Sequence, residues 1–179
     1  MSALNELQPE VRGLIIGLPY RVGVWISHAD DEDGEADDKK EMKALEHIIK
    51  SIAHVHESST FVQEVAQQTL QRKDQWEIWA NHSFDILADC EKAVAALKAH
   101  INDNDLKDYR KTIVNIAETV ASAYGEFGMG AEDESVLSGF LGKVVGKLKG
   151  EEDEADFMNI SPAEEAALER LKTALRDPE

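Results

Sequence analysis

Apolar residues recur at intervals of three and four along most of this chain, and this spacing constrains the fold more than any other feature. Such intervals place side chains on one face of an α-helix. Alternating apolar and polar runs, which would indicate strands, are nearly absent. We therefore predict an all-α fold, namely a single domain of about seven helices in two loosely repeated halves.

Two apolar stripes follow one another in the first half of the chain. One begins at Met42 and ends near His56, and the other covers "TFVQEVAQQTLQRK". Ser58 or Ser59 can cap the second helix, because a serine hydroxyl accepts a hydrogen bond from a free N–H of the first turn. We expect two consecutive helices here.

A long helical pattern occupies the middle of the chain, from Asp74 to about Ile101. It predicts a single helix whose buried face includes Trp76 and Trp79. The cluster "NDND" ends that helix and caps the next one. The next stripe reaches Tyr124, and we expect "GEFGMG" to break the chain after it.

The C-terminal part of the sequence divides into three segments. A further helix with inward-facing apolar residues covers 136–148, and an acidic linker spans 150–160. The amphipathic segment 161–176 opens with "SPAE", which has the form of a capping box with proline in the first turn. We predict a helical domain over 1–149 and a C-terminal helix that either packs on this domain or is tethered to it.

Acidic residues outnumber basic residues by 36 to 19, which gives a formal net charge of −17. Such a surface repels phosphate backbones and anionic membranes, so we expect no nucleic-acid partner. The most apolar run, "GLIIGLPYRVGVWISHA", is interrupted by Pro19 and Arg21 and is too short to insert across a membrane. The single cysteine, Cys90, allows no internal disulfide and is expected to be a small buried side chain. We predict a cytoplasmic protein whose natural partners are cations or basic protein surfaces.

The stretch "SHADDEDGEADDKKEMKAL" places an acidic loop immediately before a helical pattern. On a helical wheel, Asp38 and Glu41 fall on the same side as the apolar residues that follow them. Acids are common in a first helical turn, where the helix dipole favours them, but they are less common on its core-facing side. The turn around "GEFGMG" repeats this layout in part. The candidate metal ligands are Asp30, Asp33, Glu35, Asp38, Glu41, Glu126 and Asp133.

Carboxylates gathered at one turn must spread apart, take up protons or recruit positive charge. Two of them about 4 Å apart repel by about 4 kcal/mol at an effective dielectric constant of about 20. Calcium or magnesium would supply the missing charge, and both ions prefer oxygen ligands. The loop does not match an EF-hand, because Ala29 and Lys40 would stand at two obligatory ligand positions. The alternative is a solvated acidic loop that serves only solubility.

The run "HADDEDGEADDKKEMKAL" resembles the signature of the TerB-like family, named for tellurite resistance protein B. Asp33, Gly34, Glu35 and Glu41 match its pattern of an acid, a glycine and then acids that open a helix. The second half, "AETVASAYGEFGMGAEDESVLSGFL", resembles the family's second copy, with Tyr and Gly where an acid–glycine pair is usual. The resemblance covers about residues 10–150. It implies about seven helices with pseudo-twofold symmetry, an acidic face for divalent cations, and a cytoplasmic role in stress responses alongside membrane-associated partners.

No motif in the sequence supports catalysis. There is no Gly-x-Ser-x-Gly, no Glu-x-x-His pair, and no strand before "GEFGMG" that would make it a dinucleotide site. The one enzymatic alternative is hydrolysis assisted by a metal at the same acids. Two other hypotheses remain: a cation-binding module that regulates a protein partner, or a metal-independent adaptor whose acidic face docks on a basic partner.

Overall fold

A computed structural model of the chain describes residues 2–29, 35–54, 59–81, 85–127 and 162–176. In these ranges the regular secondary structure is eight α-helices and one short 3₁₀ helix, without a strand. The predicted all-α class is therefore confirmed. The elements in chain order are α1 (Ala3–Glu6), α2 (Pro9–Ser27), α3 (Glu35–His54), α4 (Thr60–Gln71), the 3₁₀ helix η1 (Lys73–Gln75), α5 (Trp76–Ala80), α6 (Ile86–Lys98), α7 (Asp103–Phe127) and α9 (Pro162–Ala174).

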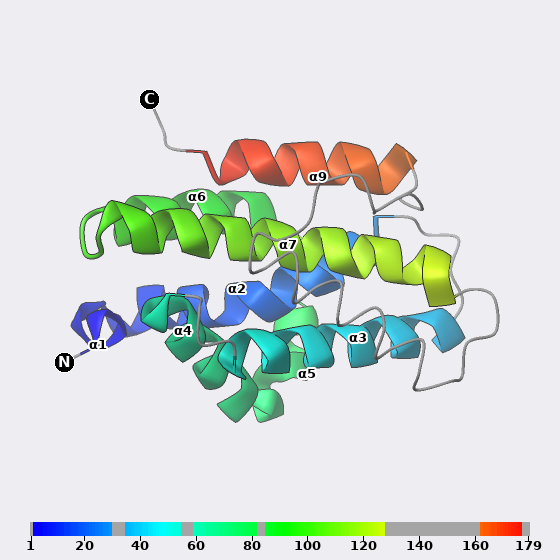
Figure 1. Cartoon of the computed structure of the whole chain (residues 1–179), viewed down its shortest axis with the longest axis horizontal. Coiled ribbons are helices and arrows are strands. Elements are labelled where there is room, and N and C mark those ends of the chain that lie inside the picture. Colours follow the sequence, from blue (N-terminus) through cyan, green and yellow to red (C-terminus); the bar gives the residue numbers. More distant parts are fainter. Residues whose placement is uncertain (1, 30–34, 55–58, 82–84, 128–161, 177–179) are drawn as a thin grey trace.

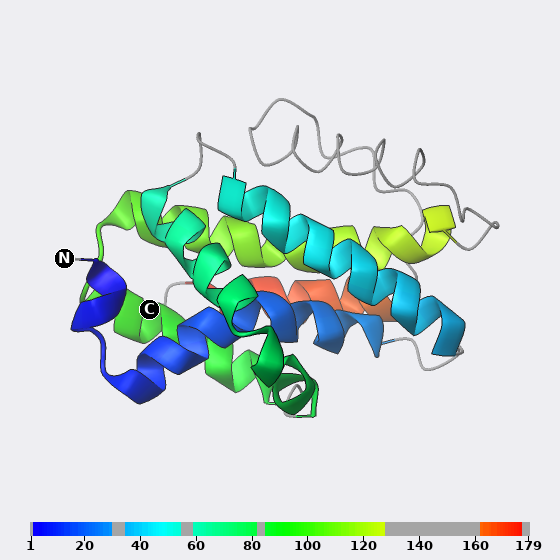
Figure 2. The same cartoon turned by 90° about the horizontal axis from the view of Figure 1, so that it is seen from below.

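Helix α2 is the centre of the bundle. Nearly every residue from Ile15 to Ser27 is buried, and α3, α4, α5, α6 and α7 all pack against this helix. Helices α6 and α7 lie on one side of α2, whereas α3, α4 and α5 lie on the other (Figures 1 and 2). A helix that is apolar on all sides must be surrounded. The most apolar run of the sequence, "GLIIGLPYRVGVWISHA", therefore forms most of the central helix of the bundle.

Proline 19 stands inside α2 without leaving the neighbouring carbonyl groups unsatisfied. A proline has no N–H, so Ile15 loses the donor that its carbonyl oxygen would have in a regular helix. The Tyr109 hydroxyl of α7 donates to that oxygen at 3.1 Å. The Thr69 hydroxyl of α4 lies 2.7 Å from the carbonyl oxygen of Ile16. The Tyr109 hydroxyl thus supplies the hydrogen bond that the backbone of α2 cannot give to Ile15.

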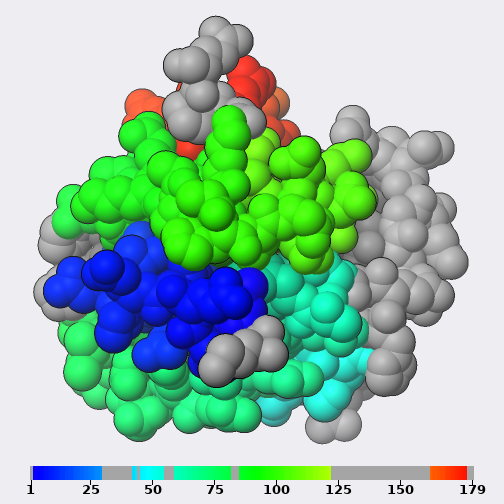
Figure 3. All heavy atoms as spheres, turned by 90° about the vertical axis from the view of Figure 1, so that its left-hand side faces the viewer, coloured from blue at the N-terminus to red at the C-terminus, as the bar shows by residue number. Residues whose placement is uncertain are grey.

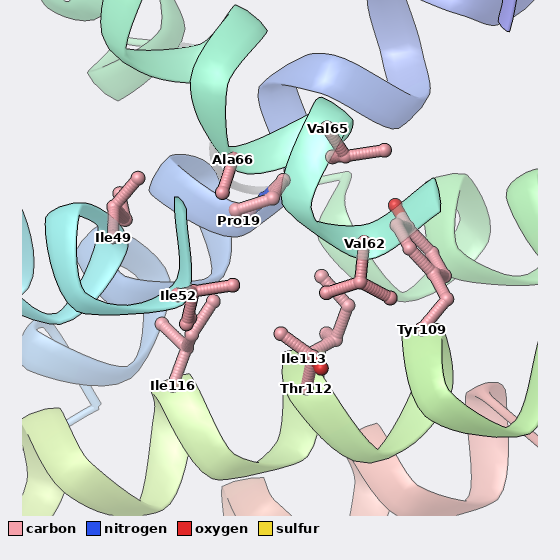
Figure 4. Close-up of a pocket in the computed structure, with 10 residues that line it drawn as sticks. All are labelled: Pro19, Ile49, Ile52, Val62, Val65, Ala66, Tyr109, Thr112, Ile113 and Ile116. Atoms are coloured by element: carbon pink, nitrogen blue, oxygen red, sulfur yellow. The ribbon is translucent and has the colours of Figure 1, made fainter. Parts of the chain in front are cut away.

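Helix α3 buries the apolar stripe that its sequence predicts. Leu45, Ile48, Ile49 and Ile52 are at most 2% exposed, and they face α2, α4 and α7. Together with residues from α2, α4 and α7, two of them line a gap of about 10 Å³ in the core (Figure 4). That volume is about the minimum for one water molecule, and the lining is mostly apolar. The gap is a packing defect that has no room for a ligand.

Two predicted helix caps are present. The Ser59 side chain accepts hydrogen bonds from the backbone N–H groups of Phe61 and Val62, so Ser59 caps α4. Asn102, the first asparagine of "NDND", accepts a hydrogen bond from the backbone N–H of Asp105 at 2.9 Å and so caps α7. Seen from the end that carries the N-terminus, α1 and the start of α2 lie between α4 and the beginning of α7 (Figure 3).

The prediction of one helix from Asp74 to Ile101 is wrong. The chain forms η1, then the five-residue α5, and starts a new helix at Ile86. Trp76 stacks on Tyr20 of α2, with 4.4 Å between the ring centroids, whereas Cys90 and Leu97 of α6 are buried farther along the bundle. Polar Asn81, a poor helix former, ends α5. The apolar spacing alone does not reveal that the two parts contact α2 in different directions.

The predicted break at "GEFGMG" begins later than expected. Helix α7 continues through Gly125 and Glu126 to Phe127. One glycine in a helix costs about 1 kcal/mol relative to alanine, which a long packed helix tolerates. The predicted helix over 136–148, the linker 150–160 and the capping serine at 161 lie outside the described residues.

The C-terminal helix α9 packs on α6 and α7 at the surface opposite α3 (Figure 1). Its apolar seam is buried, with Leu171 fully covered and Leu168 4% exposed. At the edge of this contact, the Lys172 ammonium nitrogen lies 3.4 Å from a carboxylate oxygen of Glu118 on α7. The helix is thus part of the packed bundle.

Candidate functional site

The predicted acidic site lies largely beyond the described parts of the chain. Asp30, Asp33 and Asp133 fall outside the described residues. Glu35, Asp38 and Glu41 belong to the first two turns of α3, and Glu126 belongs to the last turn of α7. For these four acids, the structure shows where each residue stands along its helix.

Three helix ends lie toward the end of the molecule where those acids are found. Helix α2 ends at Ser27, α3 begins at Glu35 and α7 ends at Phe127, all toward the end of the molecule opposite the N-terminus (Figures 1 and 2). The C-terminal ends of α2 and α7 carry partial negative charge from their carbonyl groups. The N-terminus of α3 carries partial positive charge, but the formal charges of its acids outweigh it, so positive charge is favourable at this end of the molecule.

The described side chains form no ready-made metal centre. Within the described ranges, three or more His, Cys, Asp or Glu side chains nowhere come close enough together to hold a metal ion. Cys90 is buried as predicted, and burial raises the pKa of its thiol to about 12. The thiol therefore stays protonated at neutral pH and is not a nucleophile there.

A buried ion pair joins α2 to α6 on another side of the molecule. The Arg21 Nη2 atom donates to Asp89 Oδ2 at 2.7 Å, and the two side chains are only 9% and 14% exposed. The Lys92 ammonium nitrogen lies 3.7 Å from the other carboxylate oxygen of Asp89. The guanidinium group in the otherwise apolar α2 is therefore neutralised by a carboxylate within the bundle.

Beside this ion pair is a solvent-open cleft of about 330 Å³. Gly13 and Leu14 of α2 line one side, and Trp79 of α5 lines another. The exposed acids Glu10 and Asp85 also line it. With the ion pair included, the described residues that line the cleft contribute three carboxylates and one guanidinium, for a formal charge of −2. The cleft combines an aromatic wall with an acidic lining.

Aromatic residues fix the position of α5 relative to α2. Trp76 stacks on Tyr20 and donates its indole N–H to the carbonyl oxygen of Thr69 at 3.0 Å. Trp79 lies 3.4 Å from the position that a Cβ atom would take at Gly17, so the indole packs directly against the backbone of α2. Both tryptophans are half-buried and pack against the core. Trp79 thereby becomes a fixed wall of the cleft.

Reasoning from the sequence missed this cleft. Arg21 was informative only as an interruption of an apolar run, although one arginine in such a run also indicates a buried acidic partner. The partner, Asp89, is 68 residues away along the chain. No spacing rule connects positions that far apart. The sequence could therefore show that Arg21 needs an acidic partner, but not which acid it is.

Comparison with protein-family models, with curated proteins and with solved structures finds no match for this chain. Within the described ranges, no helix combines the length and the hydrophobicity that a bilayer crossing requires. What the fold and the described sites define is a strongly acidic, all-α bundle. Its function has to be inferred from its own residues.

Proposed function

We propose that this protein is a non-catalytic, cytoplasmic helical module that binds a divalent cation at the acidic start of α3. Occupancy of the site would regulate its contact with a protein partner in a stress response. The observation that supports the proposal is that α2 and α7 finish toward the same end of the molecule at which the acidic helix α3 starts.

The electrostatics of that region favour a small, hard cation. The first two turns of α3 carry Glu35, Asp38 and Glu41, directly after the acidic run that includes Asp30 and Asp33. Calcium and magnesium take carboxylate and carbonyl oxygens as ligands, and both kinds of group are available at this end. The net charge of −17 further raises the local concentration of cations.

The resemblance of "HADDEDGEADDKKEMKAL" to the TerB-like signature supports the same proposal from the sequence. It is the reason to propose a stress-response partner, including one associated with a membrane. The matching positions Asp33, Glu35 and Glu41 belong to the proposed cation site.

Thermal unfolding with and without metal tests the cation site. A cation at a hundredfold excess over its Kd stabilises the folded state by about 2.7 kcal/mol. For a chain of this size, that corresponds to a rise in Tm of about 5–10 °C. We expect calcium, magnesium, manganese or zinc to raise the Tm relative to a chelator, and the double variant Asp33→Asn, Glu41→Gln to abolish the rise.

The matched control removes the same charge at the opposite end of the molecule, with Glu6→Gln and Asp103→Asn, which are exposed in α1 and at the start of α7 (Figure 1). This variant should keep the response to metal. If none of the four ions changes the Tm of the unaltered protein at millimolar concentration, the cation site does not exist.

The second candidate function is a metal-independent adaptor that binds a basic partner through its acidic surface. The described cleft with a formal charge of −2 favours this function, because its acids need no metal to attract a positive group. The two functions are separated by partner binding in chelator. Binding that weakens steeply with salt but ignores chelator would support the adaptor.

A further inference from the structure

We propose that the cleft between α2 and α6 is a recognition site for a basic side chain, an arginine or a lysine, of a partner protein. The cleft borders Gly13, Trp79 and the Arg21–Asp89 ion pair. It does not include the acidic start of α3. The inference deepens the adaptor function and is independent of the cation site.

The first argument comes from the glycines of α2. A glycine inside a helix costs stability, and close packing usually compensates for it. A Cβ atom at Gly23 would lie 2.5 Å from Leu45, whereas one at Gly17 would lie at an ordinary contact distance of 3.4 Å from Trp79. At Gly13, by contrast, no described atom lies within 4 Å of the position of a Cβ atom. Packing within the bundle thus requires a glycine at position 23, whereas Gly13 has open space beside it where it lines the cleft.

The second argument is the charge of the lining. Asp89 is already engaged by Arg21, but Glu10 and Asp85 are exposed beside it, and the lining as a whole is negative. A carboxylate or phosphate ligand would meet these acids and be repelled. A guanidinium or ammonium group would be attracted, and an indole wall suits a cation as well. The chemistry of the lining therefore selects a basic group.

The third argument is size. A volume of about 330 Å³ is at the lower end of the range for small-molecule sites, which extends to about 1,000 Å³. The cleft is also open to solvent along one side. It suits one long side chain projecting from a protein surface better than an enclosed cofactor.

The test is a titration of the full-length protein with the blocked tripeptide acetyl-Gly-Arg-Gly-amide, followed by ¹H–¹⁵N NMR in the presence of chelator. We expect saturable shifts of the backbone signals of Gly13 and Leu14 and of the Trp79 indole. The same peptide with citrulline, which has the shape of arginine without its charge, should leave these signals unchanged. Because chelator is present, failure of the cation site would not affect this result.

Variants locate the binding in the cleft. Gly13→Leu fills the cleft and should weaken peptide binding by about tenfold or more without lowering the Tm. Glu10→Gln with Asp85→Asn should weaken binding severalfold, whereas the charge-matched Asp103→Asn with Glu165→Gln should leave it nearly unchanged. Gly13→Ala, a smaller addition, should weaken binding less than Gly13→Leu.

Three results would overturn the inference. One is the absence of shifts at Gly13 and Trp79 up to millimolar peptide. The second is equal binding by the Gly13→Leu variant, which would place the peptide elsewhere on the acidic surface. The third is methylguanidinium binding as tightly as the peptide, which would make the cleft a site for small organic cations.

Discussion

At the scale of single residues, a hydroxyl group from another helix replaces one backbone donor of the central helix. Pro19 removes a backbone donor in the middle of α2, where water cannot replace it. Tyr109, which is 1% exposed, brings its hydroxyl to the carbonyl oxygen of Ile15. Pro19 leaves the Ile15 carbonyl group without its helical donor, and Tyr109 provides a replacement, although 90 positions separate the proline and the tyrosine along the chain.

Replacing Tyr109 with phenylalanine removes only the hydroxyl that donates to Ile15. We expect Tyr109→Phe to lower the free energy of unfolding by about 1–3 kcal/mol, because a buried carbonyl group would lose its donor. Urea unfolding of the variant and of the unaltered protein measures this loss.

The control for this prediction is Pro19→Ala, which restores a backbone N–H that can donate to Ile15. In that background, Tyr109→Phe should cost less, and the double-mutant cycle should give a coupling energy of about 0.5–1.5 kcal/mol. An equal loss in both backgrounds would mean that the hydroxyl does not replace the missing N–H.

At the scale of elements, the position of each glycine in α2 decides how closely a neighbour can approach. Gly23 allows Leu45 of α3 to lie against the backbone of α2. A Cβ atom at Gly17 would instead meet Trp79 of α5 at 3.4 Å, an ordinary van der Waals distance. Gly13 has no such neighbour among the described residues. The three glycines look alike in the sequence, but a methyl group at each would have a different effect.

Alanine at two of these glycines should change stability in opposite directions. Gly23→Ala should lower the free energy of unfolding by about 1–3 kcal/mol, because its Cβ atom would overlap the fully buried Leu45. Gly13→Ala should raise the free energy of unfolding by about 0.5–1 kcal/mol, because alanine stabilises a helix relative to glycine and its Cβ atom would meet no neighbour here. Urea unfolding measures both.

The clash can be checked separately by adding Leu45→Val to Gly23→Ala. Valine lacks the terminal carbon atoms that would overlap, so this second change should recover part of the lost stability. If Gly23→Ala is as stable as Gly13→Ala, the close approach of α3 to α2 is not as tight as described.

At the scale of the whole molecule, the core contains buried groups that can ionise at alkaline pH. Burial raises the pKa of the Cys90 thiol to about 12 from an ordinary value of 9.0. Burial also raises the pKa of Tyr109 well above 10.0 and that of Tyr20 in the same direction. These groups resist ionisation in the folded state but ionise readily when the chain unfolds.

The stability of the bundle should therefore fall as the pH rises above about 9. A group whose pKa is higher in the folded state stabilises fully below its unfolded pKa, and this contribution is lost as the pH rises toward the folded value. For Cys90 that window extends from 9.0 to about 12. Urea unfolding at a series of pH values from neutral upward measures the decline.

Cys90→Ala is the control, because it removes the group with the lowest ordinary pKa of the three. The decline should then begin at a higher pH, where only the tyrosines ionise. A stability profile that is flat above pH 9 in the unaltered protein would contradict the prediction.

Local signals in the sequence predicted much of the bundle. The stripe of Leu45, Ile48 and Ile52 and the cap at Ser59 depend on neighbours within a few positions, and the structure confirms them. The division between α5 and α6 was missed, because the apolar spacing continues across it. The cleft was missed because its walls come from α2, α5 and α6, and no local pattern connects them.

The sequence by itself determined the all-α class, the acidic character and most helix faces, because periodicity, charge and capping are properties of short segments. Only the tertiary structure decided which helix is central, which side chains satisfy the carbonyl groups near Pro19, and which acid pairs with Arg21. These outcomes depend on contacts between segments far apart in the chain. Such contacts exist only once the helices have packed, since burial is what requires every polar group to find a partner.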